Sequence, residues 1–330
     1  MADFKSVLNI DENTKWRIER QRQIERQAKR DADRRHAMMR QPFLEERLLT
    51  EDNPPNCTLA AFKEPRLRKC PFKFDQISRV DKITQHPDQN AGKCDGGLDG
   101  WNWKVDFEGV TGGPFVLKLF WDYEPPEPPY YFAAQRECQN VALLQQMHEA
   151  LRPETADKGP VRILPAPEDR SECRANLMAF CDEQRAIQKQ HPKHEDLEDV
   201  TSMPQLRRCY GWMKVTSAQL KAKIPRKRWP PFVDCGKVVR GLDRPTNEKE
   251  YLAIVYEYIE ESENVAETMQ ETINFLHNAG FHFCLSSMLR NWKNSMLVDH
   301  SDIIHVGGNG WRNVRLLTAE ELLPGEGRCR

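Results

Sequence analysis

The chain has 330 residues, of which 39% are hydrophobic and 30% charged, and its formal net charge is −1. This length allows one large domain or two small ones with a buried core. The near-zero net charge gives no reason to expect that the surface as a whole binds nucleic acid or membranes. The N-terminus lacks a long apolar core and no apolar run reaches the ~20 residues of a membrane span, so we expect no membrane and no secretion.

The ten cysteines are scattered and include no C-x-x-C pair. Without a secretory signal, their spacing favours reduced thiols in the nucleus or the cytoplasm over a disulfide framework. His191 and His194 form the only close histidine pair, in a charged stretch. We therefore expect no structural zinc site.

Residues 1–50 are predicted to form a charged helical extension, with one helix over 11–49 that is interrupted near Pro42. Residues 15–40 hold ten Lys/Arg and four Asp/Glu, and apolar residues are sparse among them. A helix that is polar all round is either solvated or docked on a partner. We expect a protein partner rather than nucleic acid, because no aromatic residues alternate with the basic ones.

Residues 51–75 look like a linker, because prolines recur there at positions 54, 55, 65 and 71. The basic runs at 66–69 and 226–228 match nuclear-import signals, although runs this short are common by chance. Residues 76–312 are predicted to form the main domain, with a polar insertion near 152–204, and residues 313–330 a tail.

Within the main domain, strands are predicted at 72–80, 101–109 and 114–123, the last two as a hairpin. Helical spacing of apolar residues predicts a long helix over 130–151, which Pro153 ends. Further strands are expected at 209–215 and 251–260, a loop at 216–247, a helix at 261–280 that Gly280 ends, and a short helix at 318–323.

Four polar residues lie on or beside these predicted elements, in the chain order Lys118, Glu137, Asn291 and Asp299. Lys118 lies inside the apolar run of a strand, and an unpaired buried ammonium is costly, so a partner is expected. Glu137 lies 19 residues later on the long helix. Asn291 and Asp299 flank a polar turn and a short apolar strand. The alternatives are a solvent-facing Lys118, an exposed Glu137, and ordinary turn roles for Asn291 and Asp299.

The segments KLFWDY, ECQNVALL, RCYGWMKV, YLAIVYEYIEE and LRNWKNSMLVDHSD resemble a fungal group of truncated protein-kinase-like proteins, similar to the Fta-two kinetochore family of the Sim-four complex. The resemblance covers residues 95–312 and implies an α+β fold: a kinase-like N-lobe of antiparallel sheet plus one long helix, a truncated C-lobe, and the charged helix in front. It also implies kinetochore association.

By the same resemblance, Lys118 would hold ATP phosphates and pair with Glu137, and Asn291 and Asp299 would hold Mg²⁺. Glu257 falls in the strand and hinge that would cradle adenine. These five residues are the predicted cofactor-binding set, and Asn291 with Asp299 the predicted metal pair.

Two departures argue against catalysis. The position of the kinase catalytic aspartate is Ser286, with Cys284 and Leu285 before it, and residues 272–298 contain no Asp or Glu. Only 29 residues follow Ser301, where a kinase would continue with its activation segment. His282 is a candidate substitute base, but its place between two phenylalanines favours a packed side chain.

The loop at 91–100 also lacks the phosphate-binding glycine spacing, and Asp95 and Asp99 would repel phosphate. The first hypothesis is therefore a pseudokinase-like binding or scaffold module. The alternatives are a residual ATP/Mg-binding phosphotransferase and a chromatin-associated binder that acts through its basic helix.

Overall fold

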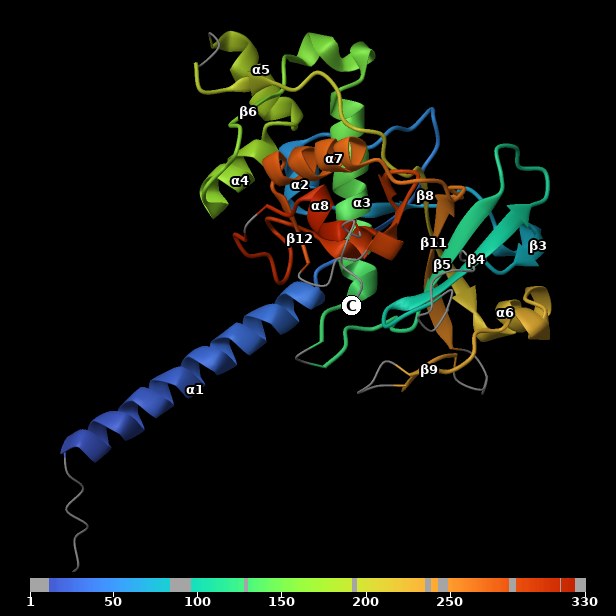
Figure 1. Ribbon diagram of the computed structural model, residues 1–330, viewed down its shortest axis with the longest axis horizontal. Helices are drawn as coiled ribbons and strands as arrows, with labels where there is room; N and C mark the ends of the chain where they lie inside the picture. Colours follow the sequence, from blue (N-terminus) through green and yellow to red (C-terminus); the bar gives the residue numbers. More distant parts are fainter. Residues whose placement is uncertain are drawn as a thin grey trace, which may run out of the picture.

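Figure 1 shows the chain as a computed structural model, in which residues 12–83, 96–127, 130–191, 195–234, 239–242, 249–284, 289–314 and 316–323 are described. One long helix projects from a body that has a twisted sheet on one side and most of the other helices on the opposite side. The molecule is of the mixed α+β class that the sequence predicts. None of its described helices combines the length and apolarity that crossing a bilayer requires.

A seven-stranded sheet forms one layer, with the order β1-β2-β8-β11-β5-β4-β3. Its strands are β1 (Leu44–Leu48), β2 (Leu67–Lys69), β3 (Ile77–Asp81), β4 (Gly100–Phe107), β5 (Phe115–Phe120), β8 (Cys209–Thr216) and β11 (Glu250–Glu257). The five strands from β3 to β8 are antiparallel, whereas β2 joins β8 and β1 joins β2 in parallel. The hairpin predicted from 101–109 and 114–123 is therefore confirmed as β4 and β5.

The two faces of the sheet pack into different cores, because successive strand residues point to opposite sides. In β5, Leu117 and Leu119 belong to the core that β3 and β4 also line. Val116 and Phe120 face α3 (Ala133–Ala150). Lys118 has the same parity as these two, so the strand alternation turns its side chain toward α3. The long helix predicted over 130–151 is confirmed in type and nearly in length.

The N-terminal region departs from the sequence prediction. α1 (Glu12–Met39) is helical, and its residues 14–31 are all exposed. Beyond Pro42 the chain is extended, and Phe43 accepts a hydrogen bond from Leu67 N at 2.9 Å as β1 aligns with β2. One helix over 11–49 is thus wrong after residue 39, because pairing with a strand far along the chain is invisible to local periodicity.

The segment 51–75, predicted as a linker, also carries structure: α2 (Leu59–Lys63), β2 and the 3₁₀ turn η1 (Phe74–Gln76). Phe62 and Leu67 are buried, and Cys70 N donates to Trp212 O at 2.7 Å. Residues 67–69 of the basic run 66–69 form β2. Arg68 is 4% exposed and donates to Asn53 O at 2.6 Å, so its side chain is not free for an import receptor.

The polar insertion near 152–204 folds against the core. Its elements are η2 (Pro153–Lys158), β6 (Arg162–Ile163), α4 (Arg170–Met178), α5 (Asp182–Gln190) and β7 (Glu198–Asp199). Cys173, Leu177 and Phe180 are buried in one cluster with α7 (Ala266–Asn278). Asn176 Nδ2 donates to Leu164 O at 2.7 Å and to Asn278 O at 2.8 Å. A few buried apolar side chains and one amide thus attach a mostly polar segment.

The remaining elements surround the sheet and α7. They are α6 (Ser217–Lys223), η3 (Arg226–Arg228), β9 (Val233–Asp234), β10 (Val239–Arg240), β12 (Phe281–Phe283), η4 (Leu289–Asn291), β13 (Trp292–Lys293), β14 (Met296–Leu297), η5 (His300–Asp302), β15 (Ile303–His305) and α8 (Ala319–Leu322). The loop predicted at 216–247 therefore holds short elements. Gly280 ends α7 with φ of +85°, and the short helix predicted at 318–323 is confirmed.

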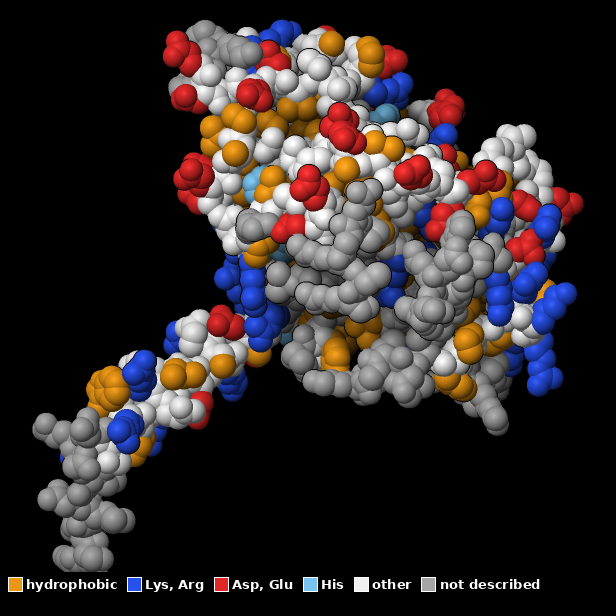
Figure 2. Space-filling model, in the orientation of Figure 1, with side chains coloured by type: hydrophobic (Ala, Val, Ile, Leu, Met, Phe, Trp, Pro, Cys, Tyr) orange, Lys and Arg blue, Asp and Glu red, His pale blue; other side chains and the backbone are white. Residues whose placement is uncertain are grey.

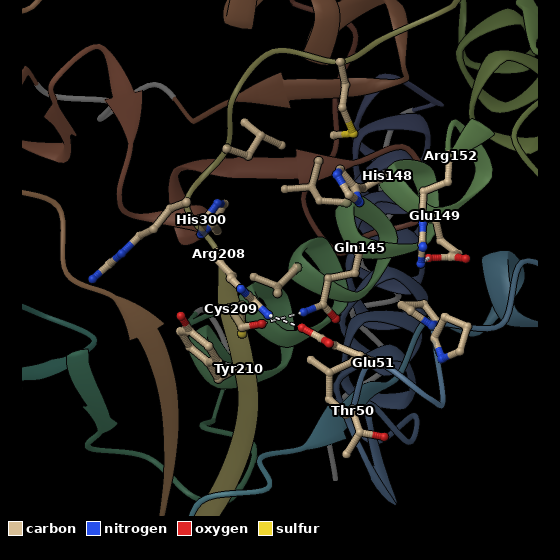
Figure 3. Close-up of a pocket in the computed structure, with 18 of the residues that line it drawn as sticks. Thr50, Glu51, Gln145, His148, Glu149, Arg152, Arg208, Cys209, Tyr210 and His300 are labelled. Atoms are coloured by element: carbon tan, nitrogen blue, oxygen red, sulfur yellow. Dashed lines mark hydrogen bonds and ion pairs between the residues drawn. The ribbon is translucent and has the colours of Figure 1, made fainter. Parts of the chain in front are cut away.

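Two segments far apart in the sequence, residues 49–55 and 203–210, lie beside the outer face of α3. Together with α3 they line a half-open cavity of about 860 Å³ (Figure 3). It is lined mainly by apolar side chains and lies outside the polar cluster described next.

Candidate functional site

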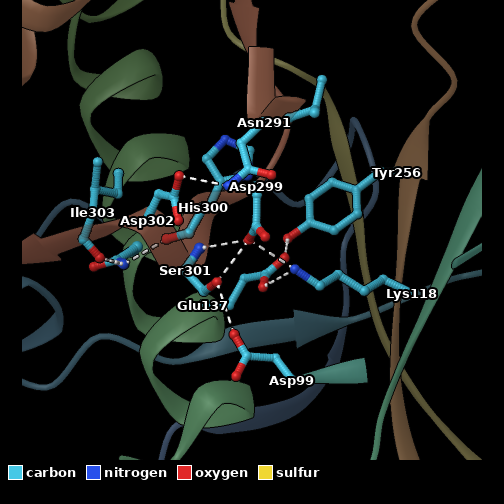
Figure 4. Close-up of polar contacts among 12 residues, drawn as sticks. Asp99, Lys118, Glu137, Tyr256, Asn291, Asp299, His300, Ser301, Asp302 and Ile303 are labelled. Atoms are coloured by element: carbon cyan, nitrogen blue, oxygen red, sulfur yellow. Dashed lines mark hydrogen bonds and ion pairs between the residues drawn. The ribbon is translucent and has the colours of Figure 1, made fainter. Parts of the chain in front are cut away.

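Lys118 and two carboxylates form the centre of the candidate site. Lys118 Nζ donates to Glu137 Oε2 at 2.6 Å and to Asp299 Oδ1 at 2.8 Å (Figure 4). Tyr256 OH donates to the other oxygen of Glu137 at 2.7 Å. Three distant parts of the chain, β5, α3 and the segment after β14, therefore meet at one ammonium. We call Lys118, Glu137, Tyr256, Asp299 and Ser301 the Lys118 cluster.

Two buried side chains hold Asp299 in place. Asn140, one turn after Glu137 on α3, donates to His300 O at 2.9 Å and to Ile303 O at 2.6 Å. Arg207 donates to Val298 O and to Glu257 O, each at 2.8 Å. The backbone on both sides of Asp299 is thus tied to α3 and to the end of β11. This is how a short, irregular segment keeps a fixed position beside the sheet.

Ser301 and Asp99 extend the hydrogen-bonded group beyond Asp299 (Figure 4). Ser301 Oγ donates to Asp299 Oδ1 at 2.7 Å and lies 3.2 Å from Asp99 Oδ2. Tyr131 OH donates to the same Asp99 oxygen at 2.5 Å. Asp99 comes from the turn that enters β4, whose residue Gly97 accepts from Trp121 Nε1 at 2.9 Å. A third carboxylate therefore lies against the cluster.

The electrostatics follow from two carboxylates sharing one ammonium in a buried place. Burial alone would lower the pKa of Lys118, but Asp299 and Glu137 raise it above the ordinary value. Burial would raise the pKa of Asp299, and the Lys118 ammonium outweighs it and lowers that pKa. Burial raises the pKa of Glu137 to about 7, with Lys118 opposing and Asp299 adding to the shift. Lys118 and Asp299 thus form the permanent ion pair.

Asn291 pairs outside this group. Its Nδ2 donates to Asp302 Oδ2 at 2.7 Å, so the amide pairs with the second aspartate of the turn rather than with Asp299. Within the described ranges, no three His, Cys, Asp or Glu side chains are grouped so that they could hold a metal ion. The predicted metal pair Asn291 and Asp299 stays a prediction.

Glu257 and His282 have structural partners. Glu257 lies at the end of β11, where its Oε2 accepts from Arg208 N at 3.2 Å, away from the Lys118 cluster. His282 Nε2 accepts from Arg312 N at 2.8 Å, so its Nδ1 carries the proton and donates to Phe283 O at 2.9 Å. Burial lowers its pKa. With both nitrogens engaged, His282 does not act as a base.

Of the predicted set, the structure brings together Lys118, Glu137 and Asp299. Ser286, at the expected position of a catalytic aspartate, lies outside the described residues, as do Leu285 and Asp95. The sequence reasoning missed Tyr256, Ser301, Tyr131, Asn140 and Arg207. Strand parity offered one usable signal. Tyr256 lies in β11, opposite Val116 of β5, and Val116 is on the same face of the sheet as Lys118. The others are found only once the chain is folded.

Comparisons with models of protein families, with curated proteins and with solved structures find no match to this chain.

Proposed function

We propose that this protein is a kinase-like module that is catalytically impaired and acts by binding partners. The strand order β3-β4-β5-β11-β8 supports this proposal, as does the ion pair from the third of these strands to the helix that follows it. Asp299 follows a short hairpin, β13 and β14, as the resemblance implies for a strand-end aspartate.

The observation that carries the proposal is the internal pairing of the Lys118 cluster. The ammonium binds both carboxylates. Ser301 Oγ lies between Asp299 and Asp99, so a third carboxylate is close to the other two. A nucleotide phosphate placed next to Lys118 would have to approach these carboxylates, and like charges at short range are unfavourable. The cluster is therefore better suited to holding the sheet, α3 and the 299–302 turn together.

A general base for phosphoryl transfer is also lacking in the sequence that precedes Asp299. Residues 272–298 contain no Asp or Glu. His282 is engaged by backbone groups at both nitrogens. A positioned acid or base contributes typically 10²–10⁴-fold to rate, so we expect transfer, if measured, to be slower by about that factor than with such a group.

We further propose that α1 provides the partner-binding element. Residues 14–31 are exposed, and a few apolar side chains lie among the Lys/Arg side chains along the helix (Figure 2). Trp16 is 58% exposed and Ile24 is 55% exposed. A helix that buries so little of its own surface is best explained by a partner that covers it.

Thermal and urea unfolding with Mg-ATP test the proposal. We expect about 5 mM Mg-ATP to raise the unfolding free energy by less than about 0.4 kcal/mol, because that is the limit when the dissociation constant exceeds the ligand concentration. Magnesium alone is the control for ionic effects.

A residual nucleotide-binding function is the second candidate, and one observation favours it. The Asp299 side chain is 28% exposed, so it is reachable from solvent. This candidate is supported if Mg-ATP stabilises the wild type by more than about 1 kcal/mol, and if Asp299→Asn abolishes that gain while Glu250→Gln, at an exposed strand position, keeps it. That result would overturn the binding-module proposal in its present form.

A further inference from the structure

The stretch of residues 200–233 contains no acidic side chain, although the whole chain has 50 Asp/Glu against 49 Lys/Arg. It holds eight Lys or Arg residues, at positions 207, 208, 214, 221, 223, 226, 227 and 228. The last five lie on α6 and η3, and Figure 2 shows Lys and Arg side chains gathered at the edge of the body where Figure 1 places α6. We call Lys221, Lys223, Arg226, Lys227 and Arg228 the α6–η3 patch.

The backbone of the α6–η3 patch is fixed to the body of the protein. Leu220 and Ile224 are buried in the core that β4 and β5 line. Trp103 Nε1, from β4, donates to Arg228 O at 2.8 Å, and Trp229 Nε1 donates to Ile224 O at 3.0 Å. The basic side chains therefore stand on an ordered surface rather than on a free tail. Binding there does not have to pay for ordering the backbone.

Most of the positive charge of the α6–η3 patch is not balanced by carboxylates. Arg228 Nη2 lies 2.9 Å from Asp81 Oδ1, which makes one ion pair. Lys223 Nζ donates to a backbone carbonyl of β3 at 3.4 Å, a contact that leaves its charge in place. Arg226 and Lys227 are exposed, and among the residues that the structure describes neither has an ion pair. The patch therefore attracts a ligand with several negative charges.

Two aromatic side chains follow the α6–η3 patch directly in the chain. Trp229 is half-buried, whereas Phe232 is 67% exposed, more than any other large apolar side chain that the structure describes. Phe232 immediately precedes the hairpin of β9 and β10, and a Cβ built on Gly241 would lie 2.7 Å from its ring. The ring therefore rests against the end of this hairpin and presents its remaining surface to solvent, close in sequence to the cations.

We propose that the α6–η3 patch and Phe232 bind single-stranded nucleic acid, with phosphates against the cations and one base stacked on the Phe232 ring. Cations alone suit any polyanion, but an exposed aromatic ring beside them favours a partner that has aromatic faces of its own. In a duplex these faces are covered by neighbouring base pairs, so a single strand fits better. This surface is separate from α1, and the inference does not rest on the function proposed above.

Fluorescence anisotropy with the full-length protein tests the proposal. The probes are labelled oligothymidylate and oligouridylate of about 12 nucleotides, within the usual site size, and the matched duplex. At about 50 mM NaCl we expect both single strands to bind at least about fivefold more tightly than the duplex, as one stacked base contributes. Raising NaCl to about 200 mM should weaken binding about 20- to 50-fold, the effect of three or four phosphate contacts. Polyglutamate of the same length should compete at least about tenfold less well than oligothymidylate.

Variants at exposed positions locate the site. Arg226→Glu/Lys227→Glu should weaken single-strand binding at least about tenfold and reduce its salt dependence, because two phosphate contacts are lost. Phe232→Ala should weaken single-strand binding at least about fivefold and leave duplex binding unchanged, which removes the preference. Lys29→Glu/Arg30→Glu is the matched control: it changes an adjacent, exposed Lys–Arg pair on α1 by the same charge and should bind within about twofold of the wild type.

Several results would overturn the inference. It is wrong if neither oligonucleotide binds, if duplex binds as tightly as single strand, or if the α1 control loses as much affinity as Arg226→Glu/Lys227→Glu. Equal competition by polyglutamate would point to an acidic protein instead, and binding to vesicles with about 30% phosphatidylserine but not to oligonucleotides would point to a membrane. If a variant does not fold, photocrosslinking of the wild type to a 4-thiouridine oligonucleotide decides: we expect adducts within residues 221–232, and adducts confined to other segments contradict the proposal.

Discussion

At the scale of single residues, Lys118 determines how two acids can be buried. Glu137 is fully buried and relies on Lys118 and Tyr256 for its hydrogen bonds. Asp299 keeps 28% of its side chain exposed and has Ser301 as a further donor. Removing Lys118 thus costs more free energy at Glu137 than at Asp299, because a buried carboxylate without a cation is unfavourable.

We therefore expect Lys118→Met to lower the free energy of unfolding by about 3–5 kcal/mol, measured by urea denaturation at pH 7. The double variant Lys118→Met/Glu137→Gln should recover part of this loss, because the neutral amide can still accept from Tyr256. Asp299→Asn alone should cost less than Lys118→Met.

Lys214 provides the matched control on β8, which is separated from β5 by β11. Its contact with Glu250 is 3.3 Å long, and the two side chains are 59% and 54% exposed. Lys214→Met should change stability by less than about 0.5 kcal/mol, as exposed pairs contribute little. A cost below about 1 kcal/mol for Lys118→Met would show that the cluster is not a stabilising contact.

At the scale of elements, the pairing of β2 with β8 attaches β1 and β2 to the rest of the sheet. Gly211, in β8, has φ of +110°, and a Cβ built there would lie 2.5 Å from Arg68 O and 2.7 Å from Cys70 N. Both are backbone atoms of or next to β2, so neither can move aside cheaply. Only glycine allows the two strands this approach.

Gly211→Ala is expected to destabilise the protein by more than about 2 kcal/mol, since it combines backbone strain with a clash. Hydrogen exchange at Cys70 N, which donates to Trp212 O, should accelerate. Gly97→Ala is the control, because a Cβ there meets nothing within 4 Å, and it should stay within about 0.5 kcal/mol. Equal effects of the two changes would contradict the role given to Gly211.

At the scale of the whole molecule, buried histidines make stability depend on pH. Burial, with Arg207 adding, lowers the pKa of His300 to about 3, and burial, with Arg136 and Arg170 adding, lowers that of His305 to about 4. As the pH falls below 6.5, the unfolded chain takes up these protons first, so stability is lost on acidification. Glu137, whose pKa is raised to about 7, partly offsets this between pH 7 and 4.5.

His305→Asn tests this dependence, because asparagine can still accept the hydrogen bond from Gly307 N and does not titrate. Between pH 7 and pH 5 the variant should lose about 2 kcal/mol less unfolding free energy than the wild type. His148→Asn, at an exposed site on α3, should follow the wild type. Identical pH profiles for His305→Asn and the wild type would contradict a neutral, buried His305.

The same molecule shows how far local patterns reach. Alternation along 101–109 predicts β4, the apolar run within 114–123 predicts β5, and apolar residues at helical spacing predict α3. The segments 51–75 and 152–204 were predicted as a linker and a polar insertion. Their few buried residues, such as Phe62, Leu67 and Phe180, find partners only in distant parts of the chain.

In the candidate site, the sequence by itself predicted a partner for Lys118, since an unpaired ammonium buried inside an apolar strand is costly. It also put Glu137 and Asp299 on elements that reach that partner. Only the tertiary structure decided that both carboxylates bind the same ammonium, that Asp99 and Ser301 adjoin them, and that Asn291 pairs with Asp302 instead. Side-chain pairing across 181 residues depends on the three-dimensional packing of sheet, helix and turn, which no local spacing encodes.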